Sequence, residues 1–122
     1  MTIPRLAPNG PDIVLTSAAK LLNLGNSGAS KNVDWGKSPI QQVTLTQGGA
    51  IINCVSSLPP GESCRVTLLV QQDATGNRTP SLPLLQAPTG GITWSTAPLA
   101  IDVLDIIWDG AAARCSLFGG GY

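Results

Sequence analysis

The acidic residues Asp102, Asp105 and Asp109 form the one cluster whose residue type suits acid–base chemistry or metal binding. They belong to an apolar stretch that alternates like a β-strand, and successive strand side chains point to opposite faces. Asp102 is therefore expected on one face and the other two on the opposite face, about 13 Å apart. That spacing is too long for a shared proton or calcium ion and exceeds the carboxyl separations of glycosidases. We expect Asp102 and Asp105 to be solvent-facing or interface charges and Asp109 to be a turn residue.

The three cysteines, Cys54, Cys64 and Cys115, lack metal-binding spacings such as CxxC. Cys54 and Cys64 flank a turn and could form a disulfide, but thiols acting as small hydrophobic side chains are the favoured interpretation. The sequence has no histidine, which excludes Ser-His-Asp and Cys-His nucleophiles and imidazole ligands for zinc. The glycine run 119–121 lacks the lysine and helix of a phosphate loop, so it indicates a flexible or closely packed tail. We expect no enzyme activity, no metal and no cofactor.

Tryptophan is the third residue type with a chemical use, and the chain has Trp35, Trp94 and Trp108. An exposed indole stacks on sugar rings, whereas a buried one anchors a core or a subunit interface. Core or interface packing is the favoured interpretation. Trp35 and Trp94 are kept as candidate glycan-binding or interface aromatics.

The composition limits the classes of partner. The chain has 122 residues, seven basic and seven acidic, and only 11% of them are charged. Binding to nucleic acid is disfavoured, because it needs a clustered basic face. No secretory signal or stretch of 18 apolar residues is visible, so we expect synthesis and folding in a reducing cytoplasm.

The elements that must position these residues are predicted to be β-strands. Alternating or continuous apolar patterns, separated by turn residues such as Asp109-Gly110, predict strands at 42–47, 50–55, 64–72, 101–108 and 112–118. Weaker candidates lie at 12–16, 79–85 and 92–94, and residues 17–24 fit a helical turn or a strand equally well. Seven or eight short strands predict an all-β fold, an antiparallel β-sandwich or jelly roll, over a single domain of residues 12–122. No internal repeat is apparent.

The first eleven residues form a separate segment. Three prolines within residues 1–11 exclude a helix and predict an extended arm. An extended arm binds a partner protein by lying in a groove or adding a strand to a sheet. The candidate partner-binding residues of the arm are Ile3, Pro4, Arg5, Leu6 and Pro8.

The order of motifs in residues 40–120 carries a family resemblance. Ile92-Thr93-Trp94 and Ala97-Pro98 precede a strand that enters Trp108-Asp109-Gly110, and upstream strands such as Val66–Asp73 also fit. This arrangement resembles a small β-sandwich module of tailed bacteriophages, found in capsid decoration, head-fibre and tail-fibre proteins. The resemblance implies a virion structural protein, commonly trimeric. Ala111-Ala112-Ala113 depart from it, because such modules usually place aromatic residues there.

Two functions fit this resemblance. Because the sequence shows no fibre shaft, our first expectation is a capsid decoration protein on the phage head surface. It would bind the major capsid protein, associate with itself as a homotrimer, and stabilise the assembled shell by mass action. The alternative is a tail- or head-fibre tip that binds a host receptor or glycan through Trp35, Trp94 or the loops 73–78 and 86–91. A small lectin unrelated to phage is a more distant possibility.

Overall fold

The computed structural model describes residues 20–122, with the backbone alone for residues 116–118. The expected arm 1–11, its residues Ile3, Pro4, Arg5, Leu6 and Pro8, and the expected strand 12–16 lie outside the described residues. The described part contains eight strands and no helix, which confirms the all-β prediction. The strands are β1 (Leu22–Asn26), β2 (Ser30–Asp34), β3 (Ile40–Leu45), β4 (Ile51–Val55), β5 (Cys64–Gln72), β6 (Leu85–Gln86), β7 (Ile101–Trp108) and β8 (Ala113–Gly119).

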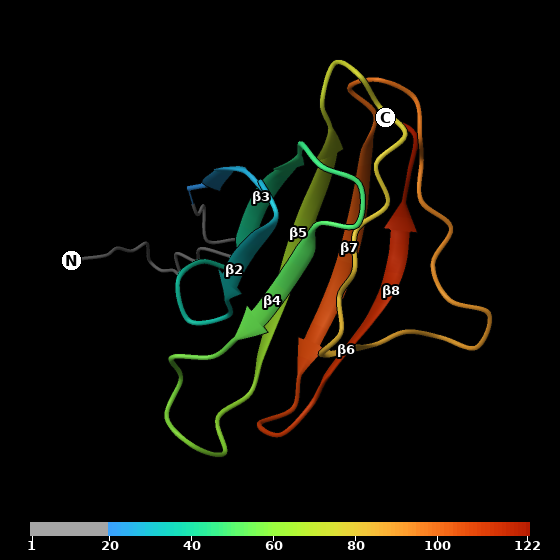
Figure 1. Ribbon diagram of the computed structural model, residues 1–122. Helices are drawn as coiled ribbons and strands as arrows, with labels where there is room; N and C mark the ends of the chain where they lie inside the picture. The colour runs from blue at the N-terminus through green and yellow to red at the C-terminus, as the bar shows by residue number, and fades with distance from the viewer. Residues whose placement is uncertain (1–19) are drawn as a thin grey trace, which may run out of the picture.

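The strands form two sheets, seen one in front of the other in Figure 1. Sheet A has six strands in the order β1-β3-β5-β7-β8-β6, and sheet B pairs β2 with β4. The neighbours β5, β7 and β8 are antiparallel, as predicted, but β1, β3 and β5 run parallel, and so do β2 and β4. The expectation of an antiparallel sandwich or jelly roll is therefore wrong for the first half of the domain. There the chain alternates between the two sheets and winds as a β-solenoid.

The solenoid contains a repeat that the sequence pattern did not reveal. Paired residues of β2 and β4 are 21 positions apart, and Gly-Ala-x-x-Asn recurs at that offset in 28–32 and 49–53. Gly28 and Gly49 both have positive φ, 54° and 69°, at the corner that leads into each strand. The expectation of no internal repeat is therefore wrong, because the repeat consists of a few corner residues.

The weaker strand predictions were confirmed only in part. The ambiguous stretch 17–24 yields strand β1 from Leu22, within the part of it that is described. The expected edge strand 79–85 shrinks to one bridge between Ser81 and Ile51 followed by the two-residue β6. Its prolines explain the loss, since they cannot donate to a ladder. Residues 92–94 form no strand.

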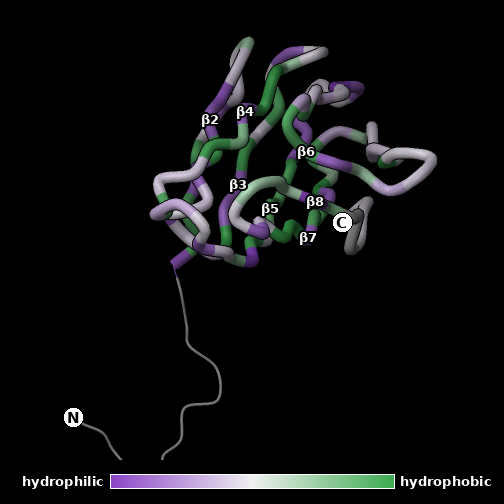
Figure 2. Tube along the Cα trace, turned by 90° about the horizontal axis from the view of Figure 1, so that it is seen from below, coloured by the Kyte–Doolittle hydropathy of each residue, from purple (hydrophilic) through white to green (hydrophobic). Residues whose placement is uncertain are grey.

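The hydrophobic core lies between sheet B and the inner face of sheet A. Figure 2 shows hydrophobic residues along the strands and polar residues at many of the loops. Alternate residues of β3, β5 and β7 point inward, as their period-2 pattern predicts. The fully buried side chains include Val33, Val43, Leu45, Ile52, Val66, Leu68, Leu104 and Ile106.

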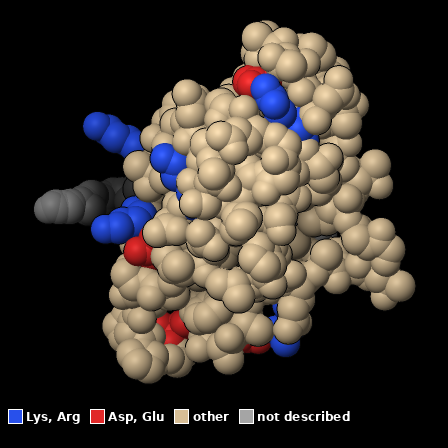
Figure 3. Space-filling model, viewed as in Figure 1, with Lys and Arg blue, Asp and Glu red and all other residues tan. Residues whose placement is uncertain are grey.

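The surface carries few charges. On the face shown in Figure 3, acidic and basic side chains are sparse, and the centre is free of them. The three ion pairs of the described residues are Arg65–Asp105, Arg78–Asp73 and Arg114–Asp109. Within residues 20–122, no helix is long and apolar enough to cross a membrane.

Candidate functional site: a loop platform at one end of sheet A

Two loops meet where β5 ends and β7 begins, at the top of Figure 1. The N–H of Leu99 donates to the carbonyl of Asp73 at 3.0 Å, and the N–H of Asn77 donates to that of Thr96 at 2.8 Å. Gly76 lies so close that a Cβ there would be 2.6 Å from the Thr96 carbonyl oxygen. We call residues 73–78 and 95–99 the loop platform.

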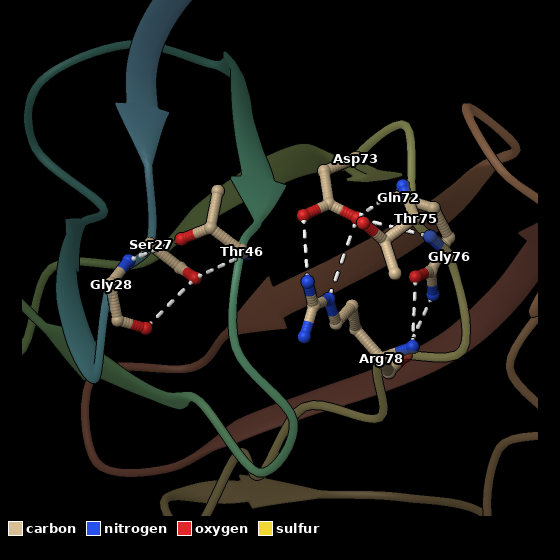
Figure 4. Close-up of polar contacts among 8 residues, drawn as sticks. All are labelled: Ser27, Gly28, Thr46, Gln72, Asp73, Thr75, Gly76 and Arg78. Carbon is tan, nitrogen blue, oxygen red and sulfur yellow. Dashed lines mark hydrogen bonds and ion pairs between the residues drawn. The ribbon is translucent and has the colours of Figure 1, made fainter.

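Asp73 organises the first loop (Figure 4). Its carboxylate accepts backbone N–H groups from Thr75 at 3.1 Å and Gly76 at 3.0 Å, and pairs with Arg78 at 3.0 Å. The hydrogen bond from the Arg78 guanidinium lowers the pKa of Asp73, assisted by the two backbone N–H donors. The loop is therefore held in one conformation by a side chain that stays ionised at neutral pH.

The side chain of Gln72 forms hydrogen bonds with both loops of the platform. It is 2% exposed, and its side-chain oxygen accepts the N–H of Arg78 at 2.9 Å. Its amide nitrogen donates to the carbonyls of Arg78 at 2.7 Å and Ser95 at 2.9 Å. Every polar atom of this buried side chain has a partner, which makes it a rigid support.

Figure 4 also shows the hydrogen bonds that fix the corner between β1 and β2. Ser27 Oγ accepts the N–H of Thr46 at 3.1 Å, and Thr46 Oγ1 accepts the N–H of Gly28 at 3.0 Å. These reciprocal bonds attach the corner to the residue that follows β3, beside the end of the sheet that carries the loop platform.

Asp102 supports the second loop and corrects a prediction. It was expected to face solvent or an interface, but it is 2% exposed and lies on the same face of β7 as Leu104. Its two carboxylate oxygens accept the N–H of Ser95 at 2.8 Å and its hydroxyl at 2.7 Å. These bonds compensate the cost of burying the side chain. Gly120 packs on Asp102, since a Cβ there would be 2.5 Å from Oδ1, so the glycine tail is closely packed.

The platform contains both non-glycine residues of the described chain that have positive φ. Asn77 has φ of 58° and Leu99 has φ of 64°. A left-handed backbone costs a residue such as leucine roughly 1–2 kcal/mol. Leu99 is also 58% exposed, so burial of its side chain does not repay this cost. Strained backbone positions cluster at functional sites, which makes Leu99 a candidate contact residue.

The surface of the platform is suited to neutral partners. Its two ionised side chains, Asp73 and Arg78, pair with each other. In the described part of the chain, no group of three or more His, Cys, Asp or Glu residues is placed to hold a metal ion. The exposed residues of the platform are Ala74, Thr75, Asn77, Thr96, Ala97, Pro98 and Leu99.

Neither tryptophan named from the sequence belongs to the loop platform, although Trp94 directly precedes its residue Ser95. Trp35 is 3% exposed within the core, so its ring is not available for stacking on a sugar. Trp94 is half-buried and lines a cavity of about 160 Å³ together with Leu82, Leu85 and Ile92. The loop 86–91 near it is exposed throughout and closes with a turn, in which Gly91 N–H donates to the Pro88 carbonyl at 2.8 Å.

The cysteines behave as apolar side chains. All three are free thiols, with Cys54 and Cys115 buried and Cys64 half-buried, so the open possibility of a Cys54–Cys64 disulfide is not realised. Burial raises the pKa of Cys54 to about 12 and also raises that of Cys64 and Cys115.

The other two aspartates of the 102–109 cluster lie where the sequence analysis expected them. Asp105 pairs with Arg65 at 3.0 Å on the outer face of sheet A. Asp109 is the turn residue between β7 and β8, where its carboxylate accepts the N–H groups of Ala111 and Ala112, both at 2.8 Å. Neither residue belongs to the platform.

The sequence named only half of the platform. Loop 73–78 was a candidate for the receptor-binding alternative, but Leu99 and loop 95–99 were missed. The signal available was Ala97-Pro98, which marks a turn without showing that the next residue takes positive φ.

A comparison with protein families adds an independent finding. Residues 31–113, which hold β3 to β7 and the whole platform, match a family model described as "Putative phage tail fibre C-terminal domain". The chain belongs to this family. It is therefore a structural module of a bacteriophage virion, as the sequence resemblance implied. The tail-fibre domain family favours the fibre alternative over capsid decoration, and it does not support a place on the head surface. Comparison of this tail-fibre domain with curated proteins and with solved structures finds no match.

Proposed function

We propose that this tail-fibre domain is the host-facing end of a phage tail fibre and contacts the cell surface through its loop platform. The observation that carries this function is the family match over residues 31–113. The choice of the platform within the domain rests on Leu99, whose strained backbone is fixed by the hydrogen bond from its N–H to the Asp73 carbonyl in the other loop.

The chain enters the domain near the end of sheet A that lies opposite the platform, which supports this proposal. At Lys20, where the described chain begins, the carbonyl accepts the hydroxyl of Ser38 at 3.2 Å, just before β3. Strand β3 then runs to Leu45, which pairs with Gln72 beside the platform. Six strand residues span about 20 Å. Residues preceding the domain therefore join it near one end of sheet A, and the platform occupies the other.

The chemistry of the platform points to a neutral surface as its target. Leu99 offers an exposed apolar side chain and Asn77 an exposed carboxamide, with no free charge beside them. Rigid loops of this kind lose little conformational entropy when they bind. We expect adsorption to depend weakly on salt, because few charges are neutralised in the contact.

Self-association is part of the same proposal. We place the contact of the expected homotrimer on the outer face of sheet A, where Ile107 is 46% exposed and the cross-strand neighbours Val103 and Leu69 are half-buried. A hollow of about 200 Å³ opens there, lined by Thr67, Val103, Leu104 and Asp105. Exposed apolar surface of this kind is commonly covered by a partner.

The test replaces Leu99 with glycine and measures adsorption of the purified chain to host cells. Glycine removes the apolar side chain and also accepts φ of 64° without strain, so Leu99→Gly stays folded. We expect at least about a tenfold loss of adsorption, because an anchoring side chain in a contact contributes this much. Leu84→Gly, which removes an exposed leucine elsewhere, is the control and should adsorb normally.

Unchanged adsorption of Leu99→Gly would contradict the assignment of the platform. Capsid decoration, with the major capsid protein as partner, stays a prediction. It requires that the purified chain add to phage heads that lack it and raise their heat resistance.

A further inference from the structure

A row of side chains crosses the outer face of sheet A at the end that carries the loop platform. Its paired residues on β1, β3, β5 and β7 are Asn26, Thr44, Gln71 and Ile101. Tyr122, at the end marked C in Figure 1, pairs with Ile101 in turn. We call these five residues the uncharged row, and we propose that it binds a neutral oligosaccharide of the host cell surface. The proposal names the ligand class of the host contact described above and rests on that function.

The backbone of Tyr122 is fixed to the start of β7. Its N–H donates to the Ile101 carbonyl at 3.2 Å, and the Ile101 N–H donates to the Tyr122 carbonyl at 3.1 Å. Two residues that exchange both hydrogen bonds form an antiparallel pair, so their side chains lie on the same face of the sheet. Ile101 alternates with the buried Asp102, so this face is the outer one.

The ring of Tyr122 lies against the backbone of Gly119. A Cβ at Gly119 would be 3.0 Å from Cε2 and Cζ of the ring, so only glycine leaves room for it. Gly119 pairs with Val103, whose side chain is also on the outer face. The Tyr122 side chain is nevertheless 70% exposed, more than any other large apolar side chain of the described residues. The ring is therefore held on the surface with most of its area open for stacking on a sugar.

The carboxamide of Gln71 occupies the middle of the row and connects it to the platform. Its Nε2 donates to the Leu99 carbonyl at 3.4 Å, and its Oε1 accepts Nε2 of Gln42 at 2.9 Å. A carboxamide nitrogen has two N–H donors and its oxygen accepts two hydrogen bonds, so both side chains keep capacity for a ligand. The hydroxyl of Thr44 and the exposed carboxamide of Asn26 continue this polar part of the row.

The absence of charge in the row selects a neutral ligand. The platform cation Arg78 pairs with Asp73 at 3.0 Å. Asp105, which pairs with Arg65, is four residues beyond Ile101 on β7, about 13 Å along the strand. A carboxylate or phosphate group bound at the row would lose hydration without gaining a cation as partner. A neutral sugar instead stacks its C–H face on the tyrosine ring and bonds its hydroxyls to the carboxamides.

The dimensions of the row suit an extended ligand that lies beside the platform. Five neighbouring positions at a strand spacing of about 4.8 Å span about 19 Å, so several linked sugar rings can lie along them. Ile107, on which the proposed trimer contact is centred, is six residues from Ile101, about 20 Å along β7. The row therefore stays at the edge of that contact.

The test uses the full chain with ¹³C-labelled tyrosine. Tyr122 is the one tyrosine of the sequence, so its ring gives a single set of signals that reports contact directly. The probes are neutral trisaccharides of glucose, galactose, mannose and N-acetylglucosamine, with a trimer of sialic acid as the charged comparison. We expect at least one neutral probe to shift the ring signals in a saturable manner and sialic acid to leave them unchanged.

Calorimetry with the bound probe then compares variants. Tyr122→Ala removes the ring and should weaken binding by roughly tenfold or more, whereas Tyr122→Phe keeps the ring and should bind within about threefold of the original chain. Gln71→Glu replaces the central carboxamide with a charge and should also weaken binding by roughly tenfold. Asn32→Asp is the matched control, because Asn32 is an exposed carboxamide on β2 of sheet B, and it should bind normally.

No shift of the Tyr122 signals by any neutral probe would overturn the proposal, and so would equal affinity in Tyr122→Ala. A stronger response to sialic acid than to the neutral probes would overturn the choice of ligand. These outcomes are distinct from the test of host contact. If Leu99→Gly loses adsorption while no sugar binds, contact through the platform stands and the oligosaccharide does not.

Discussion

At the scale of single residues, the loop platform is where a residue's contribution to stability and its proposed contribution to binding differ most. Leu99 and Asn77 adopt a backbone conformation that favours glycine, yet neither is glycine and both are exposed. Their positions cost stability that the fold does not recover through burial. This combination at Leu99 is the observation on which the proposed contact with the cell surface rests.

The strain at Leu99 predicts a gain in stability. Leu99→Gly should raise the free energy of unfolding by up to about 1 kcal/mol, because relief of the left-handed strain outweighs the added freedom of the unfolded chain. Chemical denaturation measures the change. Ala74→Gly in the same platform, whose φ is not positive, is the control and should lower stability. A loss of stability in both variants would show that the strain is absent.

Asp102 and Asp105 both lie on β7 but should contribute very differently to the free energy of unfolding. Asp102→Ala leaves the part-buried N–H and hydroxyl of Ser95 without their acceptors and should cost about 2 kcal/mol. Asp105→Ala removes a surface pair with Arg65 and should cost less than about 1 kcal/mol. Urea unfolding of the two variants makes the comparison, and equal losses would refute the role given to Asp102.

At the scale of elements, sequence patterns predicted strands better than their connections. Strands β5 and β7 were predicted from apolar runs bounded by turn residues, and their buried residues alternate because each strand has one face in the core. The parallel coil was missed, because a strand's pattern does not state which sheet it joins. Its signal is confined to corner glycines such as Gly28 and Gly49. The platform was half missed for a similar reason, since no local rule assigns positive φ to Leu99.

The β7–β8 turn predicts a pH dependence of stability. Folding lowers the pKa of Asp109 from its ordinary value of 3.8 to about 2. A carboxyl whose pKa is depressed on folding stabilises the native state above its unfolded pKa and loses this effect as pH falls through the folded value. Stability should therefore decline between about pH 4 and pH 2. Asp109→Asn should flatten this decline in urea titrations, whereas an unchanged slope would argue against the turn bonds.

At the scale of the whole molecule, a β-solenoid continues into an antiparallel ladder through β5. This strand pairs with β3 in parallel and with β7 in antiparallel fashion, so it joins both halves of the domain. One end of sheet A carries the platform, and the chain enters near the other end, beside the start of β3. The arrangement suits a module that is held by its virion at one end and presents fixed loops at the other.

The outer face of sheet A predicts how the domain assembles. If this face forms the proposed trimer contact, Ile107→Lys should convert the trimer to monomers, because an unpaired charge would be buried beside Arg65. Light scattering after size-exclusion chromatography reports the mass. Leu84→Lys, exposed but outside sheet A, should stay trimeric. A trimer that survives Ile107→Lys would place the contact elsewhere.

The position of the chain on the virion tests the central claim most directly. Cryo-microscopy of phage particles labelled with an antibody fragment against the loop platform locates the domain. The account predicts label at the outer ends of the tail fibres, with the platform facing away from the particle. Label spread over the surface of the head would contradict it and would return the domain to a role in capsid decoration.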